Sequence, residues 1–138
     1  MRHLVHAAGL ENHISCDSAG TIGYHAGHAP DSRMTQCARA RGITLCGKAR
    51  PFQVRDFTDF DLILTMDGQN FADIMERAPD ATARAKVIPM VSFSTLVPRP
   101  KDVPDPYYGG QDGFVRVMQI LENACANLLA EIQAQLPA

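Results

Sequence analysis

Long apolar runs are absent from this sequence. Stretches such as residues 62–64 and 128–130 are far shorter than the roughly 20 apolar residues that cross a bilayer. The first residues include neither an apolar signal core nor a small-residue cleavage site, so we expect no secretory leader. These absences argue against a membrane-spanning protein and predict a cytoplasmic location.

Basic clusters are also missing. Thirteen Lys and Arg stand against fifteen Asp and Glu, which gives a formal net charge of -2. Because no run of basic residues can neutralise a phosphate backbone, nucleic acid is not an expected partner. Internal repeats and low-complexity segments are absent too, as expected for one compact unit.

Metal-binding and disulfide patterns are lacking as well. The cysteines have irregular spacing that fits neither a zinc site nor a disulfide framework, and we expect them to be reduced and mostly buried. They are Cys16, Cys37, Cys46 and Cys125. Two histidine pairs, at positions 3 and 6 and at 25 and 28, have no carboxylate or cysteine at matching spacing. We therefore expect no metal and no other cofactor.

What is present suits one α/β domain spanning residues 1–138. The chain is 46% hydrophobic and 20% charged, enough for one core. Periodicity and end signals predict helices over residues 1–8, 31–41, 68–78 and 114–132. Apolar or alternating segments predict strands at 13–17, 61–66 and 87–88, with an irregular stretch from 43 to 60. This alternation predicts a three-layer sandwich, a small parallel sheet flanked by helices, with functional loops beyond the carboxyl ends of its strands.

The helix expected over residues 1–8 has a signal for its end but none for its start. Gly9 can adopt the left-handed conformation that closes a helix. No Ser, Thr, Asp or Asn precedes the periodic segment to accept its first N–H groups. The sequence thus begins as if in the middle of a helix.

The segment 103–110, Val-Pro-Asp-Pro-Tyr-Tyr-Gly-Gly, is the most informative for chemistry. Pro104 and Pro106 fix their own φ angles and restrict the residues before them, so Asp105 is held as a proton donor would need to be. Tyr107 and Tyr108 can form walls for a flat aromatic ring. The alternative is a common Asp-Pro turn with amphipathic surface tyrosines.

Seven pieces in register resemble the low-molecular-weight protein tyrosine phosphatase family over nearly the whole chain. They are DSAGT (17–21), GHAPDSR (27–33), RGI (41–43), KAR (48–50), FDLILTMD (60–67), RAKV (84–87) and VPDPYYGG (103–110). The resemblance implies that a cysteine thiolate attacks the phosphorus of an aryl phosphate while Asp105 protonates the departing phenolate, then deprotonates the attacking water. The implied substrate is a phosphotyrosine protein or a small aryl phosphate.

The resemblance also implies roles for five other positions. Tyr107, Tyr108 and Tyr24 correspond to aromatic residues that line the cleft for phosphotyrosine. Ser18 corresponds to a residue that hydrogen-bonds into the phosphate loop, and Asp67 to an acid that braces it. Asp67 is equally well placed as the N-cap of the helix that follows it, and it can serve both purposes.

Two departures from the family pattern stand out, at Gly47, where many relatives have a supporting histidine, and in the nucleophile loop. The family signature is Cys-x5-Arg after the first strand, but no arginine stands six positions after any cysteine. Those positions hold Ile22, Ile43, Phe52 and Glu131. A loop of backbone N–H groups with one bidentate Arg is needed to hold phosphate and keep the thiol ionised. We therefore expect this chain to be inactive.

The missing loop predicts a particular kind of truncation. In the family, the loop opens the helix whose second half resembles residues 1–9, so the lost piece lies upstream of Met1, through a truncated gene product or a misassigned start codon. It would include the first, central strand, leaving the strands at 13–17 and 61–66 with unpaired edges.

Two other functions fit the sequence less well. A natural pseudophosphatase would keep the aromatic cleft as a non-catalytic binding module, but it would have to fold without a central strand. An arsenate reductase shares the fold and uses several cysteines, but it also needs the missing loop. The Asp105 segment favours the phosphatase.

Overall fold

The computed structural model describes residues 1–21, 32–45, 50–105 and 110–136. Helices dominate these residues, and the strands are short. In chain order the elements are α1 (Arg2–Ala7), α2 (Ser32–Ala40), α3 (Asp56–Asp59), β1 (Ile63–Thr65), α4 (Gly68–Arg77), α5 (Ala81–Ala85), β2 (Val87–Pro89), the 3-10 helix η1 (Met90–Phe93) and α6 (Gly110–Gln135).

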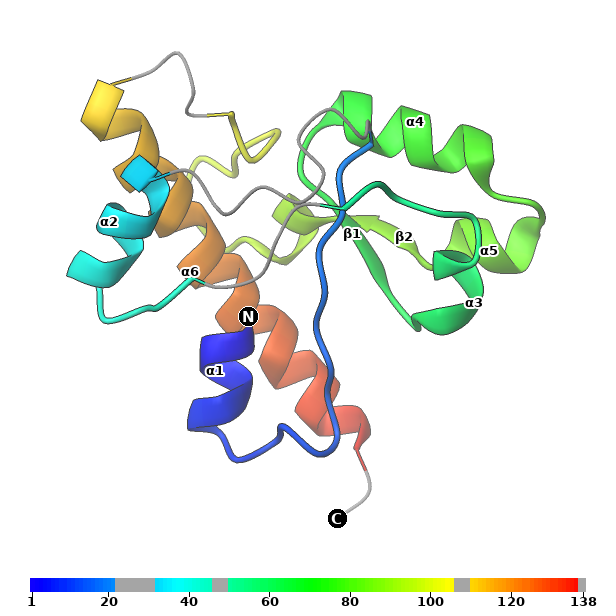
Figure 1. The fold of residues 1–138 in the computed structure, drawn as a ribbon, viewed down its shortest axis with the longest axis horizontal. Coiled ribbons are helices and arrows are strands. Elements are labelled where there is room, and N and C mark those ends of the chain that lie inside the picture. Colours follow the sequence, from blue (N-terminus) through cyan, green and yellow to red (C-terminus); the bar gives the residue numbers. More distant parts are fainter. Residues whose placement is uncertain (22–31, 46–49, 106–109, 137–138) are drawn as a thin grey trace.

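β1 and β2 form a parallel pair at the centre of the molecule (Figure 1). Ile63 pairs with Val87, and Thr65 pairs with Pro89. The chain between the two strands passes through α4 and α5, the helical crossover that parallel strands require. β1 therefore ends at the loop that leads into α4, where the carboxyl edge of the sheet begins.

Successive side chains of the β1 segment face opposite layers, as the two-residue period of a strand dictates. Leu62, Leu64 and Met66 pack against a core cluster formed by η1, Val103 and α6. Ile63 packs against a second cluster, which includes Phe57, Ile74 and Val87. Figure 1 shows α1, α2 and α6 on one side of the sheet and α3, α4 and α5 on the other. The expected α/β fold with flanking helices is confirmed.

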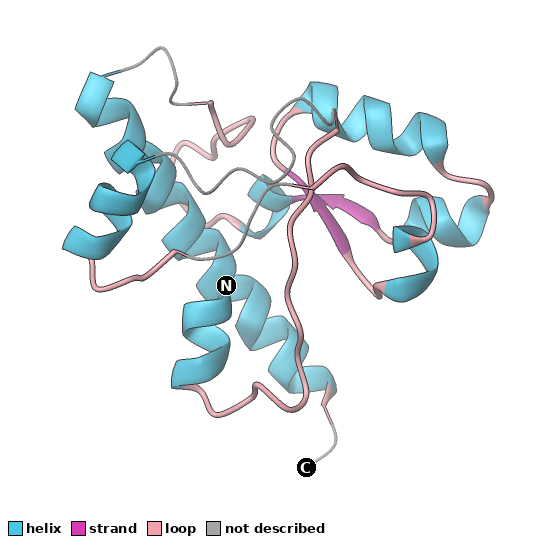
Figure 2. Ribbon diagram, viewed as in Figure 1, coloured by secondary structure: helices cyan, strands magenta, loops and turns pink. Residues whose placement is uncertain are grey.

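α6 is the longest element and supports most of one layer (Figure 2). Its apolar residues recur at helical spacing, and Phe114, Val117, Ile120, Ala124 and Leu128 are buried. η1, α2 and α1 all pack against it. This confirms the predicted long amphipathic helix.

The helix ends that the sequence predicts are confirmed within the described residues. Gly9 follows α1 with φ of 70°, and Gly42 follows α2 with φ of 80°, both in the left-handed region that favours glycine. Asp67 Oδ1 accepts a hydrogen bond from Asn70 N and so caps α4. α1 has no side-chain cap at Met1, in agreement with the missing sequence signal. Asp31, the expected cap of α2, lies outside the described residues.

The prediction of a strand at residues 13–17 is wrong. Residues 11–13 form a turn, and residues 14–19 run extended without entering a sheet of the described chain. Pairing begins only at Gly20, which forms an isolated parallel bridge with Pro51 through Gly20 N to Arg50 O and Phe52 N to Gly20 O, both 2.8 Å. Alternating polarity describes which faces of a segment are buried, but a strand also needs a partner backbone.

Three short helices were not predicted. α3 lies inside the stretch expected to be irregular, and α5 and η1 flank β2. Each has four or five residues, too few for a helical period to show in the sequence. α5 does have a sequence signal, because Asp80 Oδ1 accepts from Ala83 N and caps it.

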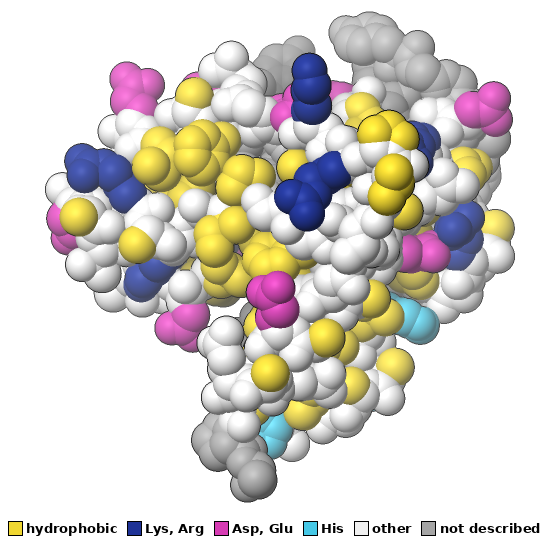
Figure 3. All heavy atoms as spheres, turned by 180° about the vertical axis from the view of Figure 1, so that it is seen from behind, with side chains coloured by type: hydrophobic (Ala, Val, Ile, Leu, Met, Phe, Trp, Pro, Cys, Tyr) yellow, Lys and Arg dark blue, Asp and Glu magenta, His cyan; other side chains and the backbone are white. Residues whose placement is uncertain are grey.

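The surface agrees with the balanced charge of the sequence. On the face shown in Figure 3, acidic and basic side chains are interspersed among apolar and polar ones. Among the helices of the described residues, none combines the length and apolar character that a membrane span requires.

Candidate active site

The segment leading to Asp105 is attached to the carboxyl end of β1. Val103 N donates a hydrogen bond to Met66 O at 2.6 Å, and the Val103 side chain, 5% exposed, belongs to the core cluster on α6. Pro104 then leads directly into Asp105, which is exposed. Asp105 is therefore preceded by a buried anchor at the end of β1 and by a proline of fixed φ.

Two carboxylates meet the N-terminus of α4 at the same edge. Asp67 Oδ1 accepts from Asn70 N at 2.7 Å, and Asp102 Oδ1 accepts from Gly68 N at 3.0 Å. The first N–H groups of a helix have no partner within the helix and form its positive end, so carboxylates are favoured there. Asp67 thus lies between two residues, Met66 and Gly68, that both hold the segment before Asp105.

Ser18 belongs to a second group of polar residues, fixed by Arg50. Ser18 N donates to Asp17 Oδ1 at 2.8 Å, and Asp17 Oδ2 accepts from Arg50 Nε at 3.0 Å. The same guanidinium binds both oxygens of Asp56, at 3.0 and 3.2 Å. Arg50 therefore connects the extended 14–19 segment to the start of α3.

The charges in this group reinforce one another. The N–H of Ser18 is the largest influence on the pKa of Asp17 and lowers it. Burial opposes this effect, but the Arg50 guanidinium adds to it, so the pKa of Asp17 is lowered. Burial, the largest single influence, raises the pKa of Asp56, but its hydrogen bonds with Arg50 and Gln53 N outweigh it and leave the pKa lowered. The pKa of Arg50 is raised by the same two carboxylates, Asp56 first. All three groups are thus held in their charged forms.

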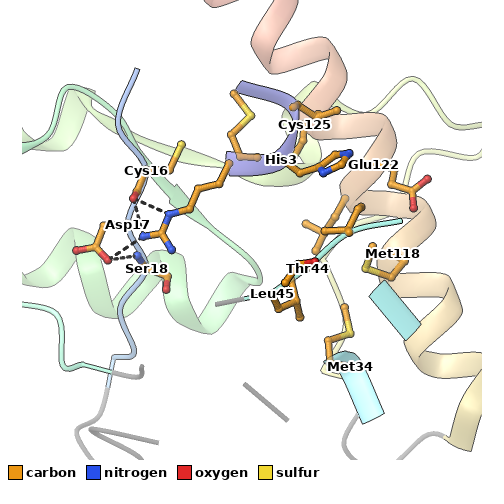
Figure 4. Close-up of a pocket in the computed structure, with 15 residues that line it drawn as sticks. His3, Cys16, Asp17, Ser18, Met34, Thr44, Leu45, Met118, Glu122 and Cys125 are labelled. Atoms are coloured by element: carbon orange, nitrogen blue, oxygen red, sulfur yellow. Dashed lines mark hydrogen bonds and ion pairs between the residues drawn. The ribbon is translucent and has the colours of Figure 1, made fainter. Parts of the chain in front are cut away.

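A cavity of about 320 Å³ opens beside Ser18, between the 14–19 segment and the helices on the other side (Figure 4). Most of its lining is apolar. The apolar side chains come from α1, α2, residues 43–45 and α6, and include Leu4, Met34, Ile43, Leu45, Met118 and Leu121. Its charged residues are paired within the protein: Asp17 with Arg50, Glu122 with Arg41, and Arg2 with the carbonyl oxygen of Cys16.

The three described cysteines form no disulfide bond. Cys37 and Cys125 are buried, and Cys16 is half-buried at the cavity. Burial raises the pKa of the Cys125 thiol, which keeps it protonated. Among the residues with assigned positions, no group of three His, Cys, Asp or Glu side chains could hold a metal ion.

Some predicted site residues lie close together in the structure, and others lie outside the described residues. Asp67 and the Asp105 segment meet at the end of β1, whereas Ser18 lies with the Arg50 group. Tyr24, Tyr107 and Tyr108 lie outside the described residues, as do Gly47 and Cys46.

Three site contacts were missed by sequence reasoning: Arg50 with Asp17, Arg50 with Asp56, and Asp102 with Gly68. Arg50 stood in one of the matching pieces, but its partners depend on how distant segments meet. Asp102 had a local signal, a carboxylate just before the Val103-Pro104 pair.

Comparison with known proteins identifies the family. The family profile described as low molecular weight phosphotyrosine protein phosphatase matches residues 1–138. This chain belongs to that family. A candidate low-molecular-weight protein-tyrosine-phosphatase of Synechocystis is 46% identical over 136 residues, which are 99% of this chain and 86% of that protein.

Human and amoebal phosphatases extend the comparison. The human low-molecular-weight phosphotyrosine protein phosphatase is 33% identical over 129 residues, 93% of this chain and 80% of its own. A crystal structure of the protein tyrosine phosphatase of Entamoeba histolytica, with Hepes in its active site, superposes with a TM-score of 0.92. It is 39% identical and the match covers 97% of this chain and 85% of that one. The phosphatase fold is therefore shown over nearly the whole chain.

Within this phosphatase fold, the two groups of polar residues differ in how they are held. Asp67 and Asp105 depend on β1 and α4, elements with regular hydrogen bonds. Ser18 depends on a segment without sheet pairing to any described strand, and there side-chain ion pairs take the place of a ladder. Arg50 binds the side chain of this segment at Asp17, and Arg2 binds its backbone at Cys16 O.

Proposed function

We propose that this chain carries the acid-base part of a protein tyrosine phosphatase, with Asp105 as the general acid and base for hydrolysis of a phosphomonoester. One observation supports this most directly: Asp105 stands between two prolines, two residues after a buried valine bonded to the end of β1. A proton donor must be held in place to gain the effective concentration on which its catalysis depends. The surrounding family match supplies the reaction class.

The proposed chemistry has two steps. A cysteine thiolate attacks phosphorus, the bond from phosphorus to the aryl oxygen breaks, and Asp105 gives its proton to the departing phenolate. Ionised Asp105 then takes a proton from water as that water attacks phosphorus, releasing phosphate and the thiolate. Phosphotyrosine in a protein or a small aryl phosphate is the proposed substrate, with Tyr24, Tyr107 and Tyr108 as cleft walls.

In these 138 residues no cysteine is followed at the sixth position by arginine, and we infer that the nucleophile is not among them. A general acid alone supplies about 10²–10⁴-fold, and only in concert with the bond-breaking step. We therefore propose that residues 1–138 by themselves are inactive, and that activity needs a Cys-x5-Arg loop from outside these residues. Ser18 and Asp67 are the proposed braces of that loop.

The cytoplasm is the proposed location. Cys16, Cys37 and Cys125 are all free thiols, which is the state that a reducing compartment maintains.

An assay with p-nitrophenyl phosphate tests the proposal. Purified residues 1–138 are expected to show no turnover above background. An extended protein, in which a family segment with the first strand and the Cys-x5-Arg loop precedes Met1, is expected to hydrolyse the substrate. Its Cys→Ser form in that loop is the matched control and is expected to be inactive.

Two results would contradict the proposal. Turnover by residues 1–138 that disappears in Asp105→Asn would show that the chain holds another nucleophile. A folded extended protein without activity would show that the site assembled around Asp105 does not perform this reaction.

A further inference from the structure

The two residues that hold the segment before Asp105 do so by different means. Val103 is held by a backbone hydrogen bond and by burial in the core. Asp102 is held through its side chain, whose Oδ1 accepts the N–H of Gly68, the first residue of α4. The Val103 contact fixes where the segment passes, and the Asp102 contact adds a second point that fixes its direction.

The chain between these anchors and Asp105 has little freedom to absorb a change. Pro104 has a fixed φ and restricts Val103, while Pro106 restricts Asp105. A rotation at Asp102 is therefore passed on to Asp105 rather than taken up by intervening residues. Asp102 therefore differs from a carboxylate that only stabilises the N-terminus of a helix.

The energetics of the contact point to geometry rather than stability. Asp102 is an exposed residue, and exposed charge contacts contribute about 0–1 kcal/mol. The N3 position of α4 is already capped by Asp67, so α4 persists without Asp102. Loss of the Asp102 contact would thus loosen the segment before Asp105 more than it would destabilise the fold.

We propose that Asp102 is a positioning residue for Asp105: its carboxylate, bound to the N-terminus of α4, sets the direction in which the Val103-Pro104-Asp105 segment leaves the sheet. The contact itself is independent of catalysis, and its consequence for the reaction rests on the proposed function. Asp102 touches neither substrate nor reacting atoms in this scheme.

Nuclear magnetic resonance on residues 1–138 tests the contact without any need for activity. Asp102→Ala removes the acceptor and is expected to raise the hydrogen-exchange rate of the Val103 amide about tenfold, with greater backbone mobility at the Asp105 amide. Asp102→Asn keeps an oxygen that can accept from Gly68 N and is expected to behave as the unmodified chain does. Asp80→Ala is the control, because Asp80 Oδ1 also accepts a backbone N–H at the start of a helix, Ala83 N of α5 at 2.8 Å, and no contact with this segment is described for it.

A kinetic measurement on the extended protein tests the consequence. Asp102→Ala is expected to lower kcat for phenyl phosphate by about tenfold to a hundredfold, because small displacements of a catalytic group cost that much, while KM stays within about twofold and Asp102→Asn restores the rate. Unchanged exchange and mobility in Asp102→Ala, or equal changes in Asp80→Ala or Asp102→Asn, would overturn the positioning role. Inactivity of the parent extended protein would count against the proposed function alone, since the exchange measurement still decides the contact.

Discussion

Arg50 joins two segments that are distant in the sequence. Its guanidinium binds Asp17 on one side and both oxygens of Asp56 on the other, and Asp56 is 4% exposed. A bidentate pair with a buried carboxylate fixes orientation as well as distance, which a lysine at this position could not do. Arg50 therefore helps to hold the segment that contains Ser18, together with Arg2, which donates to Cys16 O.

The Arg50 group predicts how stability depends on pH. Because the pKa values of Asp17 and Asp56 are lower in the folded chain than their usual 3.8, their ionised forms stabilise the fold above that value. This stabilisation is expected to disappear as pH falls through the lowered pKa values, so the free energy of unfolding should decrease below about pH 4. Urea titrations of residues 1–138 at several pH values measure this slope.

Replacement of Arg50 identifies the source of that slope. Arg50→Gln is expected to cost about 1–3 kcal/mol near neutral pH, because it leaves the Asp56 carboxylate buried without its cation, and to flatten or reverse the acid slope. Arg116→Gln, the same change at an exposed site on α6, serves as the control. An acid slope as steep in Arg50→Gln as in the unmodified chain would show that other carboxylates are responsible.

At the scale of elements, the end of β1 and the start of α4 act as one unit. Met66 O, Gly68 N and the Asp67 carboxylate each make a contact within three consecutive residues. Two of these contacts hold the segment before Asp105, and the third starts the helix. The element boundary is thus also the place where the proposed acid and the proposed brace are set relative to each other.

The cap at Asp67 can be separated from its proposed role as a brace. Asp67→Ala is expected to lower the free energy of unfolding by about 1 kcal/mol, since Asn70 N loses its acceptor. Asp67→Asn keeps the acceptor and is expected to stay within about 0.5 kcal/mol of the unmodified chain. Chemical denaturation of the two variants measures both values. Equal destabilisation by both changes would mean that charge, rather than the hydrogen bond, is what α4 requires.

Helix caps, periodicity and breakers in the sequence predicted those elements that depend on residues close together in the chain. Asp67, the spacing of Phe71 and Ile74, and Pro79 were enough to place α4, because caps, periodicity and a breaker act within a few residues. The 13–17 strand failed for the opposite reason, since its alternation was real but its backbone had no described partner. α3 has too few residues for any period to appear.

For the site, sequence reasoning found residues but not their contacts. The Asp105 segment and Asp67 could be singled out because rigid prolines and a helix cap are local features. The Arg50 and Asp102 contacts could not, because each joins segments between six and thirty-four residues apart. Their partners are set by the packing of the two layers around β1.

At the scale of the whole molecule, the fold consists of two helical layers with separate cores. The layer around α6 and the layer around α4 each have their own core cluster, and the sheet between them presents its carboxyl edge to the Asp105 segment. The chain belongs to the low-molecular-weight phosphotyrosine phosphatase family, and in its 138 residues no cysteine is followed at the sixth position by arginine. The proposed reaction therefore requires that Asp105 give a proton to the leaving group.

The most direct measurement compares two leaving groups in the extended protein. p-Nitrophenolate is a weak base that departs with little help, whereas phenolate needs a proton as its bond to phosphorus breaks. Asp105→Asn is therefore expected to reduce kcat/KM for phenyl phosphate by about 10²–10⁴-fold, and for p-nitrophenyl phosphate by at least about tenfold less. Equal reductions for the two substrates, or none for phenyl phosphate, would show that Asp105 is not the proton donor.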